Sequence, residues 1–250
     1  MDSKMLLALG AILLGTTNAR VAQAFTNPWG RDEEPFGHRL IANVHLEDGT
    51  PTPNTAEQLA AAAERLLSDV RETHYQHRTH VDAVEGVYDM DCSGFVDYLL
   101  KRVAPRQFAE LPIEPGHARP RAAVYFQFLN RLLEQPLPGW KAIRQLSQAQ
   151  RGDIMAWELQ ASTKAPGDTG HVVIVAATPI QVTQGTFRVE VYDSSGIHHD
   201  DDSRPEHTSG VGKGTITFKV NTSGEPIGFQ FNSRARFHDE PIAIGRPVSR

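Results

Sequence analysis

The chain contains little cysteine: its 250 residues include a single one, Cys92. Cys92 therefore has no disulfide partner within the chain and is a free thiol. In a protein that leaves the cytoplasm, a free thiol meets oxidants, and its presence there favours a chemical role. The alternative is an inert buried cysteine, which is common in protein cores.

The sequence also lacks long apolar runs and clusters of basic residues. No stretch is long and apolar enough to cross a bilayer. Lys and Arg number 25 against 30 Asp and Glu, which gives a formal net charge of -5. A mildly acidic chain without basic clusters argues against nucleic acid or anionic lipid as a partner. We therefore expect no nucleic-acid binding and no stable membrane insertion.

The amino-terminal segment has the pattern of a secretory signal. A short apolar run over residues 5–14 is followed by Ala22 and Ala24, which have the small side chains and the spacing that signal peptidase reads. The pattern predicts a signal peptide in residues 1–24 and a mature protein that is periplasmic or secreted. The alternative is a buried amino-terminal helix.

The rest of the chain divides into three parts. Residues 25–54 are rich in Pro, Gly and charge and predict an extended leader, 55–237 one domain, and 238–250 a loose carboxyl-terminal tail. Helical spacing of apolar residues occurs in 55–71, 92–104 and 122–133. Short β-branched or aromatic segments follow at 154–159, 171–177, 187–192, 215–220 and 227–231. Helices followed by consecutive strands predict an α+β fold, with helices packed on an antiparallel sheet.

Cys92 falls at the start of the second predicted helix, in the segment Asp91-Cys92-Ser93-Gly94. Unpaired backbone N–H groups and the helix dipole favour an anion at this position. Both effects lower a thiol pKa, so the pattern predicts a reactive thiolate. Gly94 leaves room for a substrate backbone close to the sulfur.

A thiolate nucleophile needs a base and a group that orients the base. His171 opens an apolar strand, where its side chain can face a cleft, although a lone strand histidine is often structural. Antiparallel pairing about a turn centred near Val182 places Asp193 opposite His171. This predicts that Asp193, rather than His198 or His199, accepts the imidazole N–H. The alternative is that Asp193 caps the turn that follows it.

Three segments carry a resemblance to a known family: DCSGFV at 91–96, GDIMAW at 152–157 and GHVVIV at 170–175. They resemble the NlpC-like cysteine peptidases, which trim bacterial cell-wall peptides. The resemblance covers about residues 75–195 and implies a papain-like fold. The chain departs from the family at Val173 and Val175, where typical members have Gly and then Tyr.

The resemblance implies a role for each residue of the motifs. Cys92 would be the nucleophile and His171 the base, with a polar residue on the next strand as the orienting group, for which Asp193 is the best candidate. Asp91 and Ser93 flank the sulfur where the family contacts the amino end of its peptide. An upstream tyrosine often reaches the site, and either Tyr75 or Tyr88 fits this description.

Together these observations predict an exported cysteine hydrolase, an amidase or endopeptidase, that forms a thioester at Cys92 and needs no cofactor. The expected substrate is a peptide or a peptidoglycan fragment. A non-catalytic cell-wall binding module of the same fold is one alternative. A divalent-metal protein is another, because His198, His199 and three aspartates at 200–202 are adjacent possible ligands. The same cluster also fits a solvated loop.

Overall fold

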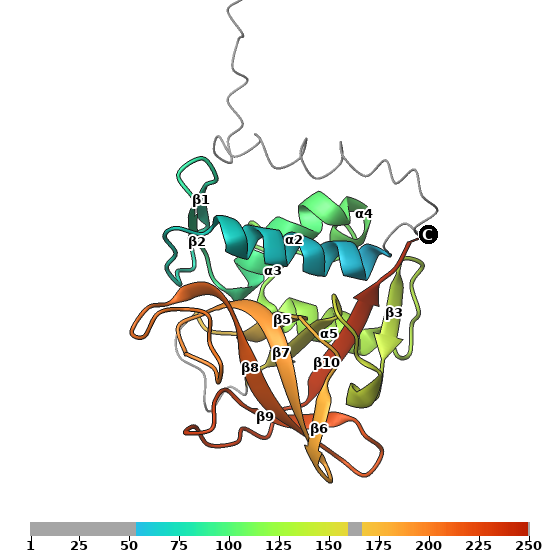
Figure 1. The fold of residues 1–250 in the computed structure, drawn as a ribbon. Coiled ribbons are helices and arrows are strands. Elements are labelled where there is room, and N and C mark those ends of the chain that lie inside the picture. The colour runs from blue at the N-terminus through green and yellow to red at the C-terminus, as the bar shows by residue number, and fades with distance from the viewer. Residues whose placement is uncertain (1–53, 160–166, 250) are drawn as a thin grey trace, which may run out of the picture. The chain divides into compact units, whose positions relative to one another are not determined.

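The computed structural model describes residues 54–159 and 167–249 (Figure 1). The predicted signal peptide, and the predicted leader apart from its last residue, lie outside the described residues. That last residue, Asn54, is the N-cap of the first described helix, α2 (Thr55–Asp69). Its side-chain oxygen accepts a hydrogen bond from the backbone N–H of Glu57 at 2.9 Å, which satisfies one donor of the first helical turn.

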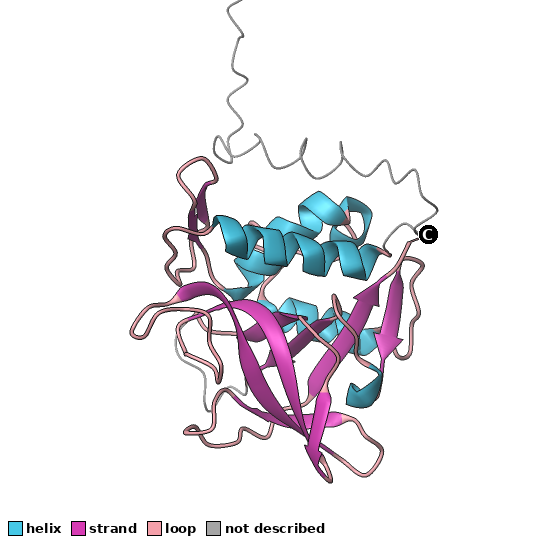
Figure 2. Cartoon of the chain, in the orientation of Figure 1, coloured by secondary structure: helices cyan, strands magenta, loops and turns pink. Residues whose placement is uncertain are grey.

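Apart from the short 3-10 helix η1 (Leu146–Gln148), the described helices lie on one side of the sheet (Figure 2). They comprise α2, α3 (Cys92–Val103), α4 (Pro105–Phe108) and α5 (Ala122–Arg131). Their apolar stripes, including Leu66, Phe95 and Phe128, join one buried cluster with the facing side chains of the sheet. The three helices predicted from periodicity are thus confirmed. No helix among the described residues has the length and apolar content needed to cross a membrane.

The main sheet has eight strands, and its recorded pairings are all antiparallel. In spatial order the strands are β3 (Trp140–Ile143), β10 (Ile242–Pro247), β4 (Ile154–Glu158), β5 (Gly170–Val175), β7 (Thr186–Ser195), β8 (Gly210–Val220) and β9 (Pro226–Gln230), with β6 (Ile180–Thr183) paired beside β7. A separate hairpin of β1 (His80–Asp82) and β2 (Val87–Asp89) precedes α3. The predicted α+β class with an antiparallel sheet is confirmed at this level.

The sheet is strongly curled. Trp157 of β4 and Phe229 of β9 belong to strands that are not neighbours in the sheet, yet their ring centroids are 4.4 Å apart. The concave face therefore closes over a second buried cluster, which also contains Val173 and Phe218. β4 and β5 are consequently buried on both faces, which explains their nearly continuous apolar sequences.

The prediction of a loose carboxyl-terminal tail at 238–250 is wrong. Residues 242–247 form β10, which lies between β3 and β4 inside the sheet. Arg246 of β10 donates from Nε and Nη2 to the buried carboxylate of Asp153, the residue before β4, at 2.6 and 2.9 Å. The sequence pattern did not reveal β10 because it is short and its partners are remote in the chain.

Candidate active site

The nucleophile candidate Cys92 lies at the first residue of α3, as predicted. Its sulfur lies 4.0 Å from the carbonyl oxygen of Gly170 and accepts a hydrogen bond from the backbone N–H of Val172. These two groups flank His171 in the chain, so the sulfur lies beside the backbone of the predicted base. The recorded β5–β7 pairs begin only at Ile174, which leaves the start of β5 accessible to α3.

A cavity of about 350 Å³ adjoins the sulfur. Its wall includes all three residues predicted to bind substrate, Tyr75, Asp91 and Ser93, together with Cys92. The remaining lining residues are His77, His117, Ala118, Arg119, Arg121, Ala122, Gly167, Asp168, Thr169 and Gly170. His171 is not among them, and only 7% of it is exposed. Cys92 therefore lines the cavity, and the buried His171 lies next to its lining residue Gly170 in the chain.

His171 and Asp193 meet as predicted, although the register differs. His171 Nε2 lies 2.7 Å from Asp193 Oδ2, which leaves Nδ1 as the ring nitrogen free for the thiol proton. The recorded pairs, Ile174 with Tyr192 and Val175 with Val191, are shifted by two residues from the predicted register. A shift of two keeps every side chain on its own face, so Asp193 becomes a diagonal neighbour of His171 instead of an opposite one.

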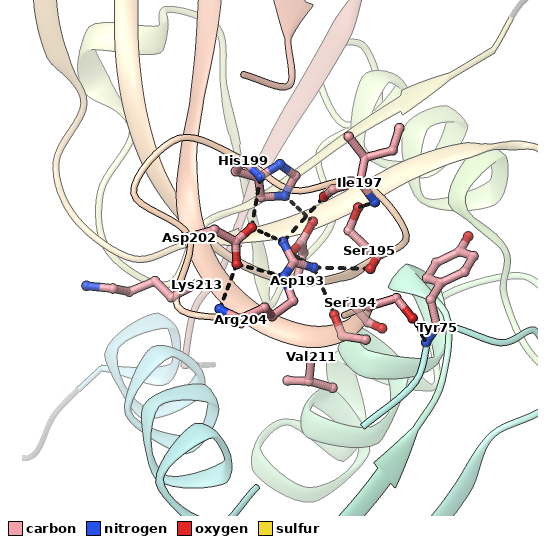
Figure 3. Close-up of polar contacts among 12 residues, drawn as sticks. Tyr75, Asp193, Ser194, Ser195, Ile197, His199, Asp202, Arg204, Val211 and Lys213 are labelled. Carbon is pink, nitrogen blue, oxygen red and sulfur yellow. Dashed lines mark hydrogen bonds and ion pairs between the residues drawn. The ribbon is translucent and has the colours of Figure 1, made fainter. Parts of the chain in front are cut away.

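A second histidine, His199, lies on the same carboxylate (Figure 3). Its Nε2 is 2.8 Å from Asp193 Oδ2, its side chain is fully buried, and its ring stacks on Phe231 with centroids 5.7 Å apart. The sequence analysis did not place His199 in contact with Asp193. The loop after β7 folds back over the strand, and strand pairing alone does not reveal such a contact.

Asp193 is fully buried and ionised. Burial raises the pKa of a carboxyl group, but the charge of His199 and hydrogen bonds from both histidines hold the pKa of Asp193 well below its usual range. Arg204 Nη1 lies 3.5 Å from the other oxygen, Oδ1. Arg204 is itself fixed by Asp202, with Nη2 2.6 Å from Oδ2 (Figure 3). The orienting group is thus part of a buried network and not the cap of a surface turn.

The pKa of the Cys92 thiol moves in the direction opposite to the prediction. The pKa of Cys92 is raised well above its usual value, mainly by burial and also by the negative charge of Asp91. The hydrogen bond from the N–H of Val172 lowers the pKa, but by less than these two effects raise it. The sequence could not reveal this because the burial of a helix N-terminus depends on its packing. The Cys92 thiol is therefore protonated at neutral pH, and attack by its sulfur would require a base.

We expect alkylation of Cys92 by iodoacetamide to be slower at pH 7 than alkylation of free cysteine. The rate should rise with pH and reach its midpoint above ~8.5, the ordinary value for a thiol, because burial penalises the thiolate. The measurement is a pH series of rates on folded protein, with unfolded protein as the control. A midpoint below ~7.5 in the folded protein would instead indicate a preformed thiolate–imidazolium pair.

Tyr75, rather than Tyr88, reaches the site. Tyr75 lines the cavity. Its pKa is raised by burial first and then by the charges of Cys92, Asp91, Asp168 and Asp193, so its phenol lies within electrostatic range of Cys92 and Asp193 alike. Tyr88 is fully buried in the helix-side core. The choice between the two tyrosines was open in the sequence because it depends on how the β1–β2 hairpin packs.

Arg119 is a site residue that the sequence did not indicate. It precedes α5, and its Nη2 lies 2.7 and 2.8 Å from the two carboxylate oxygens of Asp91. Its Nη1 donates to Ser93 Oγ at 2.6 Å and to Asp97 Oδ2 at 3.4 Å. An arginine in a Pro-containing connection has no local signal, because only the tertiary fold brings it to the helix N-terminus.

Asp97 lies one helical turn beyond Ser93 and is almost fully buried. Burial raises its pKa to about 7, although a hydrogen bond from Tyr125 at 2.7 Å and the charge of Arg119 oppose the shift. The raised folded-state pKa means that the folded protein holds this proton more tightly than the unfolded chain does. The stability contributed is therefore present below pH ~4 and is lost as pH rises through about 7.

Asp97→Asn should accordingly stabilise the protein only at the higher pH. At pH ~3.5 this side chain is largely uncharged in both the folded and the unfolded wild-type protein, so the two proteins should melt within about 1 °C of each other. At pH 8 the variant should melt at least ~3 °C higher, because it avoids a buried charge and retains the bond from Tyr125. Thermal melts of both proteins across this range are the measurement. A difference that does not change with pH would contradict the assignment.

The loop of adjacent histidines and aspartates does not converge on one point. His198 Nε2 contacts the carbonyl oxygen of Thr208, Asp200 accepts from Ser233, and Asp201 pairs with Arg188. Among the described residues, the group with potential ligand atoms within 4.8 Å of one another is His171, Asp193 and His199. The loop thus contributes a single residue, His199, to that group.

Comparison with known proteins assigns no family. No family model matches the chain, and no solved structure matches it. The chain is 27% identical over 205 residues to a protein of Acanthamoeba polyphaga mimivirus described as uncharacterized protein R653, with 70% of this chain and 88% of that protein covered. That relative's description states no activity, so the similarity brings none to this chain.

Proposed function

We propose that this protein is a cysteine hydrolase of the NlpC-like, papain-fold type, which cleaves amide bonds through a thioester at Cys92. The observation that carries the proposal is the sulfur at the N-terminus of α3, open to a cavity and beside the backbone of a histidine that is hydrogen-bonded to a buried carboxylate. A nucleophile, a base and an orienting group in this relation are the requirements for acyl transfer through a covalent intermediate.

In the proposed reaction, His171 takes the thiol proton as the Cys92 sulfur bonds to the carbonyl carbon of the amide. The amide C–N bond then breaks, and the leaving amine takes the proton from His171. Water attacks the thioester with His171 again as base, which releases the acid and restores the thiol. The backbone N–H of Cys92, the first residue of α3, has no acceptor within the helix and can stabilise the developing oxyanion.

Asp193 supports the base in both steps. Its carboxylate accepts from Nε2 of His171, which holds the ring in one tautomer and stabilises the imidazolium that forms. The raised thiol pKa makes this support important, because the proton has to be drawn from a buried thiol during attack. We further propose export after signal cleavage and a peptidoglycan stem peptide as substrate, in line with the amino-terminal pattern and the motif resemblance.

The proposal is tested by mass spectrometry of purified peptidoglycan after digestion. Wild-type protein should release peptides that are absent after incubation with the Cys92→Ala variant. New amine and carboxyl termini in the products identify the bond. Wild-type protein that binds peptidoglycan without releasing products would instead indicate the non-catalytic binding module.

A divalent-metal site is the second candidate function, because two imidazole nitrogens and a carboxylate oxygen converge at His171, Asp193 and His199. Imidazole and carboxylate ligands suit zinc and similar ions. Metal analysis of protein purified without chelators, beside the His199→Ala variant, separates this from the hydrolase. One bound ion per wild-type chain that the variant loses would favour the metal protein.

A further inference from the structure

The carboxylate next to the nucleophile, Asp91, has no acceptor site left. Its Oδ1 accepts from the backbone N–H of Gly94 at 2.7 Å and from Ser93 Oγ at 3.2 Å. Arg119 Nη2 reaches both carboxylate oxygens at 2.7 and 2.8 Å. His77 Nδ1 lies 3.2 Å from Oδ2. A carboxylate offers about four lone-pair sites, so these contacts fill it.

The guanidinium of Arg119, which pairs with both carboxylate oxygens of Asp91, is also held by other groups. Besides Asp91, Arg119 contacts Ser93 Oγ at 2.6 Å, the carbonyl oxygen of His77 at 3.2 Å and the buried carboxyl of Asp97 at 3.4 Å. Its side chain is 19% exposed, against 10% for that of Asp91. The cavity wall beside Cys92 therefore contains Asp91 and Arg119 as an ion pair in which the acceptor sites of the carboxylate are already used.

We propose that Arg119 determines specificity by closing Asp91 to ammonium groups, so that the substrate residue bound beside the scissile amide is N-acylated or internal to a chain. This inference rests on the proposed hydrolase function and names its substrate class: blocked or internal amides, and not peptides with a free amino terminus at the site. An entering ammonium would have to displace a guanidinium held by four further groups, the fourth being the carbonyl oxygen of Pro120 at 3.4 Å, and would otherwise lie near a like charge.

Asp168 is the other carboxylate in the cavity wall. It is partly exposed, and its Oδ1 lies 3.3 Å from the backbone nitrogen of Gly170. If Asp168 bound an amine, the enzyme would prefer free amino termini whatever the state of Arg119. A closed Asp91 thus predicts a preference for blocked amines, whereas amine binding at Asp168 predicts a preference for free amino termini. An experiment can separate these two outcomes.

The test uses a synthetic cell-wall stem tetrapeptide with a free amino terminus and the same peptide N-acetylated. Wild-type kcat/KM, measured by product mass spectrometry, should favour the acetylated peptide by about tenfold or more, because acetylation removes a positive charge that would otherwise lie near the Arg119 guanidinium. Arg119→Ala frees Asp91 and should reduce the preference to below about threefold or reverse it. Arg119→Gln, which keeps donors and loses the charge, should reduce it too if the alanine variant fails to fold.

The matched control is Arg144→Ala, which removes an exposed guanidinium paired with Glu225 outside the cavity. This variant should keep the wild-type preference. A wild-type preference for the free amine, or a preference unchanged by both Arg119 substitutions, would overturn the inference.

Failure of the hydrolase proposal has a different signature: wild-type protein would cleave neither peptide. Calorimetric titration of wild-type protein with both peptides then decides the inference alone. Tighter binding of the acetylated peptide, lost in the Arg119 variant, supports it. Equal binding, tighter binding of the free amine, or no binding of either peptide overturns it.

Discussion

Replacement of Cys92 by alanine is expected to abolish amide hydrolysis, with a loss in kcat on the order of 10⁵ or more. The sulfur is the proposed attacking atom, and no other thiol exists in the chain to replace it. Alanine removes one buried atom beside the start of β5, so the fold should persist. The measurement is turnover of a cleaved stem peptide, together with a thermal melt of each protein.

Cys92→Ser is the informative companion. It keeps a nucleophilic atom at nearly the same place, but a hydroxyl is a much weaker nucleophile than a thiol. We expect residual turnover of at most about one-thousandth of wild type, and an acyl-enzyme on Cys92 that mass spectrometry detects only in wild-type protein. Full activity in the Cys92→Ala variant would refute the thioester mechanism directly.

Asp193→Ala is expected to lower kcat by about a hundredfold or more without eliminating turnover. Nucleophile and base remain in place, but the ring of His171 loses its orienting acceptor and its imidazolium loses a counter-charge. Asp193→Asn should retain more activity, because an amide oxygen can still accept from both histidines. Steady-state kinetics of the three proteins on one peptide are the measurement.

These variants need a stability control. Asp193→Ala leaves the buried side chains of His199 and Arg204 without their shared carboxylate, which costs about 3–5 kcal/mol of folding free energy for a broken buried pair. Kinetics should be measured well below the melting temperature of each variant. Unchanged kcat in a folded Asp193→Ala variant would show that His171 is oriented by another group.

The two adjacent loop histidines provide a matched pair. His199 is buried against Asp193, so His199→Ala should lower kcat about tenfold through the carboxylate it holds. The imidazole of His198 contacts the carbonyl oxygen of Thr208 and not Asp193, so His198→Ala should leave kcat within about twofold. Sequence reasoning alone predicts little effect for either residue, and the contact with Asp193 is what separates them.

Much of the site could be predicted from local sequence. The N-cap Asp91, the small Gly94 and the apolar stripe after Cys92 determine a helix that begins at the thiol, because caps and periodicity act within one or two turns. His171 and Asp193 are in contact as predicted, although the predicted strand register was wrong by two residues. Side chains alternate along a strand, so a shift of two residues leaves each side chain on the same face of the sheet.

The carboxyl-terminal strand and two site residues could not be predicted in this way. β10 is inserted between β3 and β4, so its pairing partners are remote in the sequence. His199 and Arg119 come from connections whose path is set by packing and not by periodicity. Neither residue carries a local signal that distinguishes it from a solvated loop residue.

By itself, then, the sequence determined the local chemistry of this protein: a lone thiol at a helix N-terminus, a histidine at a strand entrance and a carboxylate on the same face of the next strand. Only the tertiary structure determined the thiol pKa and the partners of the carboxylates. Burial raises the Cys92 pKa although a helix N-terminus lowers it, and Arg119 pairs with Asp91. Solvent exclusion and long-range ion pairs depend on which remote segments pack together, and no short window of sequence contains that information.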